Sequence, residues 1–246
     1  MFTSRFVDEQ CEITPLLTEN LCSYKTIFEI MREHNNEDMS FEEFKQFALA
    51  DPSIGGYLNK LDEECDKYDF LYAYSTEPDH MLHEFGSGSS EVSELIKVID
   101  KGIEVISKRH PDVLFVIVAD HGHIICENRS LYEHEDFFSC LKSPQFSVEG
   151  RAAAFYVKDD KKEEFRKLAT KYYGEDFDIY SKEEVKKLKI FGLGKEHPRF
   201  DYAIGDFLLV AKSNKVFTQD FGAFLFSHHA GGTDLEKYIN LSIINE

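Results

Sequence analysis

The sequence predicts an α/β fold in which a mostly parallel sheet is flanked by helices. Residues 69–75 (DFLYAYS) are short, apolar and aromatic, as in a strand, and residues 113–119 (VLFVIVA) form the continuous apolar run typical of a buried parallel strand. Between them, residues 91–109 carry apolar side chains at helical spacing. Strand, helix and strand in this order form a βαβ unit, and 246 residues suffice to bury a sizeable core around it.

The segments before the first of these strands are expected to be helices. Residues 24–34 (YKTIFEIMREH) place apolar side chains on one helical face. Residues 40–50 begin with Ser40 and Glu43, which have the spacing of a capping box, and residues 54–67 form the third candidate helix.

Polar loops follow both strands of the βαβ unit, after Ser75 and after Ala119. The carboxyl ends of parallel strands meet at one edge of a sheet, and α/β folds place their ligands there. We therefore expect the functional residues of this protein in these two loops.

The rest of the chain predicts a small α+β insertion in a single domain of residues 1–246. Residues 151–200 contain, in order, a strand, a helix, a short extended piece and a capped helix, and we interpret them as an inserted cap-like subdomain. Residues 207–211 (FLLVA) are expected to return to the main sheet as a further strand.

Composition excludes several classes of function. Acidic residues outnumber basic ones 46 to 28, a formal net charge of -18, so binding to a nucleic-acid backbone is not expected. No apolar run approaches the roughly 20 residues of a membrane span. An acidic protein that binds an anionic substrate needs another source of positive charge, and a metal ion can provide it.

The five cysteines and the first residues favour a cytoplasmic protein. The cysteines are odd in number and form no CxxC pair, which favours reduced thiols over a disulfide framework. The first 15 residues lack a basic start followed by an apolar segment, the pattern of a secretory signal.

Three segments contain groups that bind metals. Asp79 and His83 are four residues apart, so one helical turn brings both side chains to the same face, although this spacing is common by chance. Asp120 and His121 follow the second strand, and Gly122 permits the sharp turn that directs both into one cleft. A helix-capping aspartate and a buried histidine are the alternative interpretation of that pair.

The third segment, SHHAGGTDLE, contains His228 and His229 before two glycines; a surface loop is its alternative interpretation. Taken together, the carboxylate and imidazole groups of the three segments match the mixed oxygen and nitrogen ligand sets of zinc and similar ions. His123, two residues beyond His121, can face the other way and is a candidate only for a supporting role or for solvent exposure.

Two of these segments resemble the motifs of a known family. PDHMLHEFG (78–86) resembles P-D-x-x-x-H-x-x-G, and VADHGH (118–123) resembles the D-H-G motif, of the alkaline phosphatase superfamily, type I phosphodiesterase/nucleotide pyrophosphatase branch. The resemblance extends from about Lys25 to the end of the chain and implies an alkaline phosphatase-like fold.

The resemblance also implies two divalent metal ions, usually Zn²⁺. By motif, Asp79, His83 and His229 would bind one ion, with His228 as the alternate to His229. Asp120 and His121 would bind the second. Tyr74 resembles the position of an aromatic residue that can stack on a base, although it can equally be a residue of the strand core.

The family nucleophile is a threonine or serine on a loop upstream of the helix that Lys25 begins. The preceding 24 residues show no recognisable nucleophile loop, and Thr14 is a weak candidate. We therefore expect the chain to be the carboxyl-terminal part of a longer enzyme, incomplete at the amino terminus, with a natural short form as the alternative. The chain as given is expected to show no hydrolysis.

The implied activity is metal-dependent hydrolysis of a small phosphate ester or nucleotide, of the phosphodiesterase or nucleotide pyrophosphatase type, through the two-metal site and that nucleophile. The alternatives within the superfamily are a phosphomonoesterase, a phosphomutase, a sulfatase-like enzyme or a phosphonate-cleaving enzyme. A catalytically silent metal-binding domain is the alternative outside catalysis. The oligomeric state does not follow from the sequence.

Overall fold

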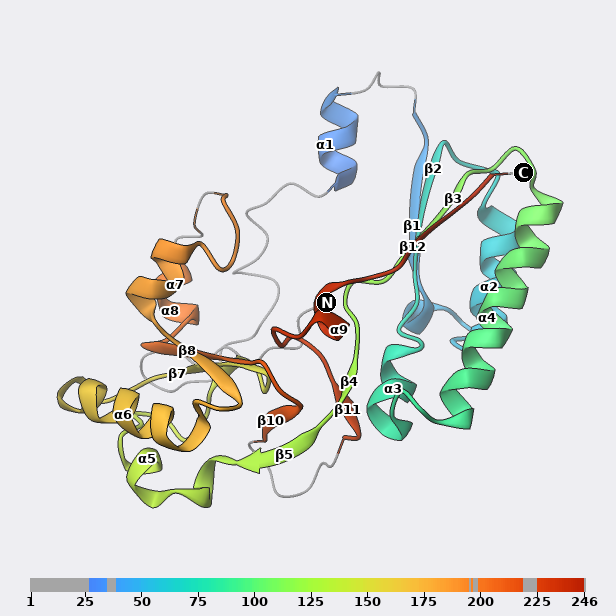
Figure 1. Ribbon diagram of the computed structural model, residues 1–246. Helices are drawn as coiled ribbons and strands as arrows, with labels where there is room; N and C mark the ends of the chain where they lie inside the picture. The colour runs from blue at the N-terminus through green and yellow to red at the C-terminus, as the bar shows by residue number, and fades with distance from the viewer. Residues whose placement is uncertain (1–26, 35–38, 195, 197–198, 219–224, 246) are drawn as a thin grey trace. The chain divides into compact units, whose positions relative to one another are not determined.

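The computed structural model describes residues 27–34, 39–194, 196, 199–218 and 225–245 (Figure 1). The chain divides into two compact units. The described residues of unit 1 lie within 121–238, and those of unit 2 lie within 27–120 and 239–245. No helix in the described part of the chain is long and apolar enough to cross a membrane. Thr14 lies outside the described residues.

Unit 2 is built from short parallel and antiparallel strand pairs with helices beside them. Its described elements are α1 (Ile27–His34), β1 (Phe41–Lys45), a 3-10 turn (Gln46–Ala48), α2 (Ile54–Glu64), β2 (Phe70–Tyr74), α3 (Asp79–Phe85), α4 (Ser90–Arg109), β3 (Phe115–Val118) and β12 (Leu241–Ile244). β1 pairs with β2 in parallel, and β3 pairs with β12 antiparallel. Figure 1 shows α2 and α4 side by side, and Cys65, Ile106 and Phe115 form a small core there.

The strand, helix and strand of the predicted βαβ segment form in that order, but the predicted pairing is wrong: β2 and β3 lie in separate two-stranded sheets, and β3 pairs antiparallel with β12. Residues 69–75 and 113–119 contain β2 and β3, and residues 91–109 lie within α4. The Ser89 hydroxyl caps α4 by accepting a hydrogen bond from the Val92 amide at 3.2 Å.

The helix predicted over residues 40–50 is wrong, because β1 lies there. Ser40 does not cap a helix: its amide and hydroxyl both donate to the Asp69 carboxylate, at 2.8 and 2.9 Å. These bonds align Phe41 with Phe70 at the start of the parallel pair. A contact between residues far apart in the sequence thus outweighs a local capping signal.

Unit 1 contains most of the buried core. Its described elements are β4 (Ile124–Ile125), β5 (Glu127–Ser130), a 3-10 turn (Leu131–Glu133), α5 (Glu135–Ser139), β6 (Ser147–Glu149), β7 (Ala152–Phe155), a 3-10 turn (Asp159–Lys161), α6 (Lys162–Tyr173), β8 (Phe177–Ser181), α7 (Lys182–Leu188), α8 (Phe200–Ala203), β9 (Phe207–Ala211), β10 (Lys215–Thr218), β11 (Ser227–His228) and α9 (Asp234–Lys237).

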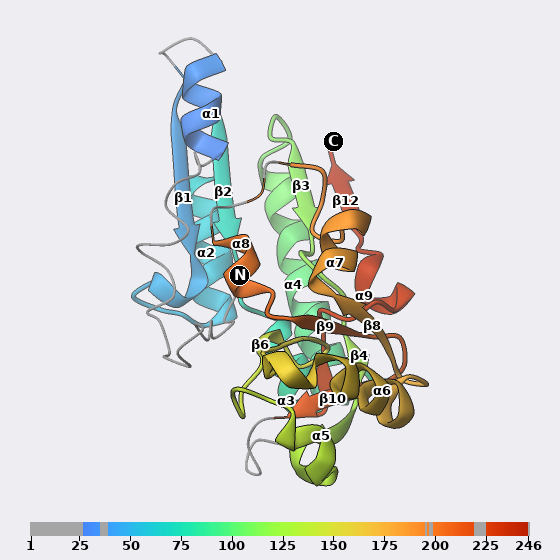
Figure 2. The same ribbon diagram turned by 90° about the vertical axis from the view of Figure 1, so that its left-hand side faces the viewer.

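The largest sheet of unit 1 has helices on both faces. It is antiparallel with the order β6-β7-β9-β8. Alternate side chains face opposite ways, so Leu209 packs with Phe137 of α5 and Phe165 of α6, whereas Leu208 packs with Val185 of α7. Figure 2 shows α7 and α5 on opposite sides of this sheet.

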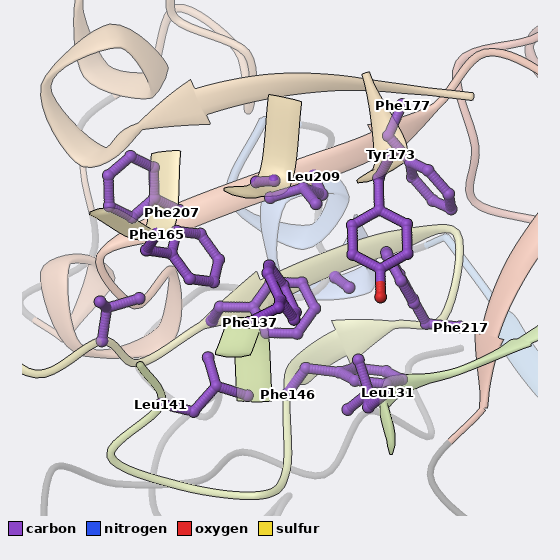
Figure 3. Packing of buried hydrophobic residues seen from close by; sticks show 14 of the residues in the cluster. Leu131, Phe137, Leu141, Phe146, Phe165, Tyr173, Phe177, Phe207, Leu209 and Phe217 are labelled. Carbon is purple, nitrogen blue, oxygen red and sulfur yellow. The ribbon is translucent and has the colours of Figure 1, made fainter. Parts of the chain in front are cut away.

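Aromatic rings fill the larger core (Figure 3). The rings of Phe155 and Phe217 meet at 87° with centroids 5.5 Å apart, and those of Tyr173 and Phe217 meet at 79° and 5.0 Å. Edge-to-face contacts of this kind fix ring orientation as well as burying area. This core holds β7, which Arg151 directly precedes, and β10, which begins at Lys215.

Two expectations about this part of the chain have different outcomes. Residues 207–211 form β9, a strand as predicted, but its place in a parallel sheet with β2 and β3 is wrong, because β9 pairs antiparallel with β7 and β8. An apolar run identifies a buried strand but not its partner. The fold is mixed α/β with small, fragmented sheets. The boundaries of a cap-like insertion at 151–200, within a single domain of residues 1–246, stay a prediction.

Candidate metal centre

Unit 2 contributes a carboxylate and an imidazole immediately after β2. The strand ends at Tyr74, and α3 begins at Asp79 after a short turn. The Nε2 atom of His83 lies 3.6 Å from Oδ1 of Asp79, one helical turn earlier. Both side chains thus lie on one face of α3, as their spacing predicts. The His83 side chain is 19% exposed and the Asp79 side chain 44%, so a solvent-borne ion can reach the pair.

A second carboxylate in unit 2 follows β3. Burial raises the pKa of the Tyr74 phenol, and the negative charges of Asp120 and Asp79 raise it further. The two carboxylates therefore act on the same phenol, which lies at the end of β2. A cation is the natural partner for such a concentration of negative charge. The role of Tyr74 as a stacking residue stays a prediction.

Unit 1 contributes three imidazoles from two loops. Strands β4 and β11 pair antiparallel, so the segment before Ile124 and the segment after His228 lie next to each other. The ring of His229 stacks on that of His121 with centroids 3.8 Å apart and an angle of 21°. The ring of His123 lies 5.4 Å from His121 and 5.2 Å from His229.

This arrangement bears on whether His229 or His228 is the metal ligand. His228 belongs to β11, where it pairs with Ile124, whereas His229 follows the strand and packs its ring with His121 and His123. The assignment of a ligand role to His229 stays a prediction, but the geometry favours it over His228.

His123, which the sequence made a candidate only for a supporting role or for solvent exposure, lies beside the other two imidazoles. It does not face away from His121, because in an extended segment residues two apart lie on the same side. Within unit 1, His123 and His229 carry imidazoles that can each offer one ligand atom to a metal ion, as can Asp79 and His83 within unit 2. The Nδ1 atom of His123 lies 3.1 Å from the Ser227 hydroxyl, a contact that orients the ring.

Two glycines let these loops pack closely. A Cβ atom on Gly122 would lie 1.9 Å from the carbonyl oxygen of Leu235. A Cβ atom on Gly231 would lie 2.7 Å from the Arg151 guanidinium and from the Glu236 carboxylate. Gly122 is therefore required by the backbone next to it, and Gly231 by the two side chains next to it.

The donor set fits a metal such as zinc. Carboxylate oxygens and imidazole nitrogens are the ligands that Zn²⁺ takes in catalytic sites. The candidate His/Asp set is divided between the units: Asp79, His83 and Asp120 belong to unit 2, and His121, His123 and His229 belong to unit 1. The described residues include carboxylates and imidazoles of the kind that the predicted centre needs. The identity and number of its ions are proposals.

Comparison with known proteins identifies the family. The model of the type I phosphodiesterase / nucleotide pyrophosphatase family matches residues 24–230. A search of curated proteins found no match.

Several solved structures share the fold. An inactive variant of murine ectonucleotide pyrophosphatase/phosphodiesterase 5 in complex with AMP is 17% identical, with a TM-score of 0.58 over 86% of this chain and 61% of its own. The human protein is 15% identical, with a TM-score of 0.60 over 87% and 62%. Phosphonoacetate hydrolase from Sinorhizobium meliloti, in complex with phosphonoacetate, is 13% identical, with a TM-score of 0.66 over 99% and 73%.

The chain thus spans about three fifths of the length of the mammalian relatives. The family match includes both motif segments and the histidine pair at residues 228–229. The chain belongs to the type I phosphodiesterase/nucleotide pyrophosphatase family of the alkaline phosphatase superfamily.

Proposed function

We propose that this chain carries the metal centre of a phosphate ester hydrolase of the phosphodiesterase or nucleotide pyrophosphatase type. Asp79, His83 and His229 bind one divalent ion, and Asp120 and His121 bind a second, with zinc as the metal. The observation that carries the proposal is the occurrence of these ligand types at the family's motif positions, on strand ends and on the paired loops of β4 and β11.

The chemistry follows from what these residues can hold. When bound, two such ions polarise the phosphoryl oxygens and neutralise the charge that develops during in-line displacement at phosphorus. Asp79 and Asp120 supply the negative charge that retains cations, and Tyr74 lies beside both as a surface for an aromatic leaving group or base.

The nucleophile is a threonine or serine hydroxyl. In its attack the hydroxyl gives its proton to solvent, the bond from its oxygen to phosphorus forms, and the bond from phosphorus to the ester oxygen breaks. The ester oxygen leaves with the electron pair and takes a proton from solvent, and water then hydrolyses the phosphoryl–protein bond and regenerates the hydroxyl. We assign this hydroxyl to no described residue. Thr14, outside the described part of the chain, stays the weak candidate.

The proposed substrate is a small phosphate ester or nucleotide. The murine relative was solved in complex with AMP, which supports a nucleotide for this chain by family likeness. The buried thiols Cys65, Cys126 and Cys140 support the reducing, cytoplasmic location that we propose for the reaction.

The experiment that tests the proposal measures AMP binding by calorimetry, with and without zinc. AMP should bind the zinc-loaded chain and lose affinity when zinc is removed, and the His83→Ala variant should behave like the zinc-free chain. His80→Ala is the matched control, because His80 lies on the same helix with its side chain 72% exposed. Equal AMP affinity with and without zinc would contradict the proposal.

A second candidate is cleavage of a carbon–phosphorus bond. It is favoured by one observation, the likeness to phosphonoacetate hydrolase over 99% of this chain. Competition separates the two: phosphonoacetate displacing AMP from the zinc-loaded chain at lower concentration than an aryl phosphodiester would favour phosphonate cleavage. The opposite order supports the phosphodiesterase type.

A further inference from the structure

A buried ion pair lies beneath the histidine loops of unit 1. The side chains of Arg151 and Glu236 are 0% and 1% exposed, and they meet in a two-bond contact, Nε to Oε1 at 2.6 Å and Nη2 to Oε2 at 2.7 Å. The remaining guanidinium hydrogens reach the carbonyls of Ser213 and Lys215 and the thiol of Cys126. All five N–H donors of Arg151 are therefore used, and its orientation is fixed.

The carboxylate of this pair holds the loop that carries His229. Oε1 of Glu236 accepts from the Gly231 amide at 2.7 Å, and Oε2 accepts from the amide and hydroxyl of Thr233. Ala230, between His229 and Gly231, has a φ of 75°, a conformation that alanine rarely adopts without such support. The loop after His229 is thus shaped by one side chain.

The same residue also holds the loop that carries His121. The carbonyl of Glu236 accepts a hydrogen bond from the Gly122 amide at 3.0 Å. Gly122 can approach this closely because it has no Cβ atom to meet Leu235. Both loops of the imidazole cluster are therefore bonded to Glu236, one through its side chain and one through its backbone.

We propose that the Arg151–Glu236 pair is the positioning element of the metal centre, which sets the relative placement of His121, His123 and His229. The inference rests on the proposed function, since it assumes that these imidazoles bind a metal. Stability alone does not explain the pair, because a well-packed apolar pair is often as stable as a buried ion pair. Glu236 is itself no ligand, because both its oxygens already accept hydrogen bonds.

The test compares the full chain with the double variant Arg151→Met/Glu236→Met. Replacing both partners leaves no unpaired buried charge, so the variant should fold, as far-UV circular dichroism can verify. The bonds to Gly231 and Thr233 are lost, however, and zinc affinity should fall by roughly 10- to 100-fold, the usual cost of losing support for ligands. The Co²⁺-loaded variant should also show an altered visible absorption spectrum.

Two controls separate positioning from general stability. Arg166→Met removes a similar two-bond pair with Glu184, about two fifths exposed, and should leave zinc affinity and the Co²⁺ spectrum unchanged. Arg151→Lys keeps the positive charge but not the planar guanidinium. It should bind zinc more tightly than Arg151→Met but more weakly than the unaltered chain.

The outcomes are distinguishable. If the unaltered chain binds no zinc, the proposed function fails. If the unaltered chain binds zinc, and the folded double variant binds it with the same affinity and Co²⁺ spectrum, the positioning role is overturned while the proposed function stands. If the double variant does not fold, the Arg151→Lys variant tests the proposal instead. Its zinc affinity should fall if the planar guanidinium of Arg151 positions the loops, and should stay unchanged if it does not.

Discussion

Single polar contacts orient two histidine side chains of unit 1. The Nδ1 atom of His121 lies 3.3 Å from the Gly122 carbonyl, and that of His123 lies 3.1 Å from the Ser227 hydroxyl. Each contact orients a ring. Glu236 differs from these histidines, because both its carboxylate oxygens already accept hydrogen bonds and hold neighbouring residues in place.

Acid should weaken unit 1 through Glu236. Burial alone would raise the pKa of this carboxyl, but hydrogen bonds from Arg151 and Thr233 outweigh it, and the pKa lies below its ordinary value of 4.5. A lowered pKa in the folded state gives stability that is present above pH 4.5 and lost as the pH falls through the folded-state value. Urea unfolding between pH 7 and 3 should show this loss.

The Glu236→Gln variant should lack that part of the pH dependence. It should also be less stable at pH 7 by about 3–5 kcal/mol, because Arg151 then stays buried without its partner. Glu175→Gln, at an exposed glutamate of the same unit, serves as the control and should follow the unaltered chain. Parallel pH profiles for Glu236→Gln and the unaltered chain would show that Glu236 does not carry the effect.

The two proposed ions should differ in how firmly they are retained. We predict that the ion of Asp79, His83 and His229 is kept through dialysis, because three ligands are assigned to it against two for the ion of Asp120 and His121. Elemental analysis after dialysis should show metal lost from Asp79→Ala and kept in Asp120→Ala. Metal kept in Asp79→Ala and lost from Asp120→Ala would reverse the assignment.

At the scale of elements, the histidine loops depend on close backbone packing. The DHGH segment lies against the start of α9 because Gly122 leaves room for the Leu235 carbonyl. Strand β4, which follows DHGH, also pairs antiparallel with β11, which precedes His229. Unit 1 therefore fixes its imidazoles through short irregular loops that are bonded to each other.

A methyl group at Gly122 should disrupt this packing. The Gly122→Ala variant should lose roughly 1–3 kcal/mol of unfolding free energy, since overpacking next to a fixed backbone forces it to shift. Gly88→Ala is the control: a Cβ atom added there would meet nothing within 4 Å, so its effect should stay within about 0.5 kcal/mol. Denaturant unfolding gives the unfolding free energy of both variants. Equal values for Gly122→Ala and Gly88→Ala would contradict the prediction.

Local elements could be predicted from the sequence where one signal dominated. The helical periodicity of residues 91–109 correctly predicted α4, and the apolar run at 113–119 correctly predicted a strand, β3, but not its antiparallel partner β12. The spacing of Asp79 and His83 correctly placed both on one helical face. In each case the information lies within one segment.

Partners distant in the sequence could not be predicted. The capping signal at Ser40 gave way to bonds with Asp69, 29 residues away, and β9 pairs with strands that its own composition does not specify. Arg151 and Glu236 are 85 residues apart, and neither carries a motif. Their signal in the sequence was only the glutamate that ends SHHAGGTDLE, three residues after a threonine, as in a capping box.

At the scale of the whole molecule, the candidate ligands come from two units that the chain joins within the DHGH segment. Asp120 is the last residue of its segment of unit 2, and His121 begins the next segment of unit 1. The central proposal is that Asp79, His83 and His229 bind the same zinc ion. A shared ion couples ligands, so substitutions at the ligands cannot act independently.

A double-mutant cycle on zinc affinity tests this claim most directly. Zinc titrations would compare the unaltered chain with Asp79→Ala, His229→Ala and the variant that carries both substitutions. The account predicts that each single substitution removes most of the affinity at the retained site and that the second adds little. If the two losses in binding free energy are instead additive, or if each substitution removes a different ion, Asp79 and His229 do not bind the same zinc and the proposed centre is wrong.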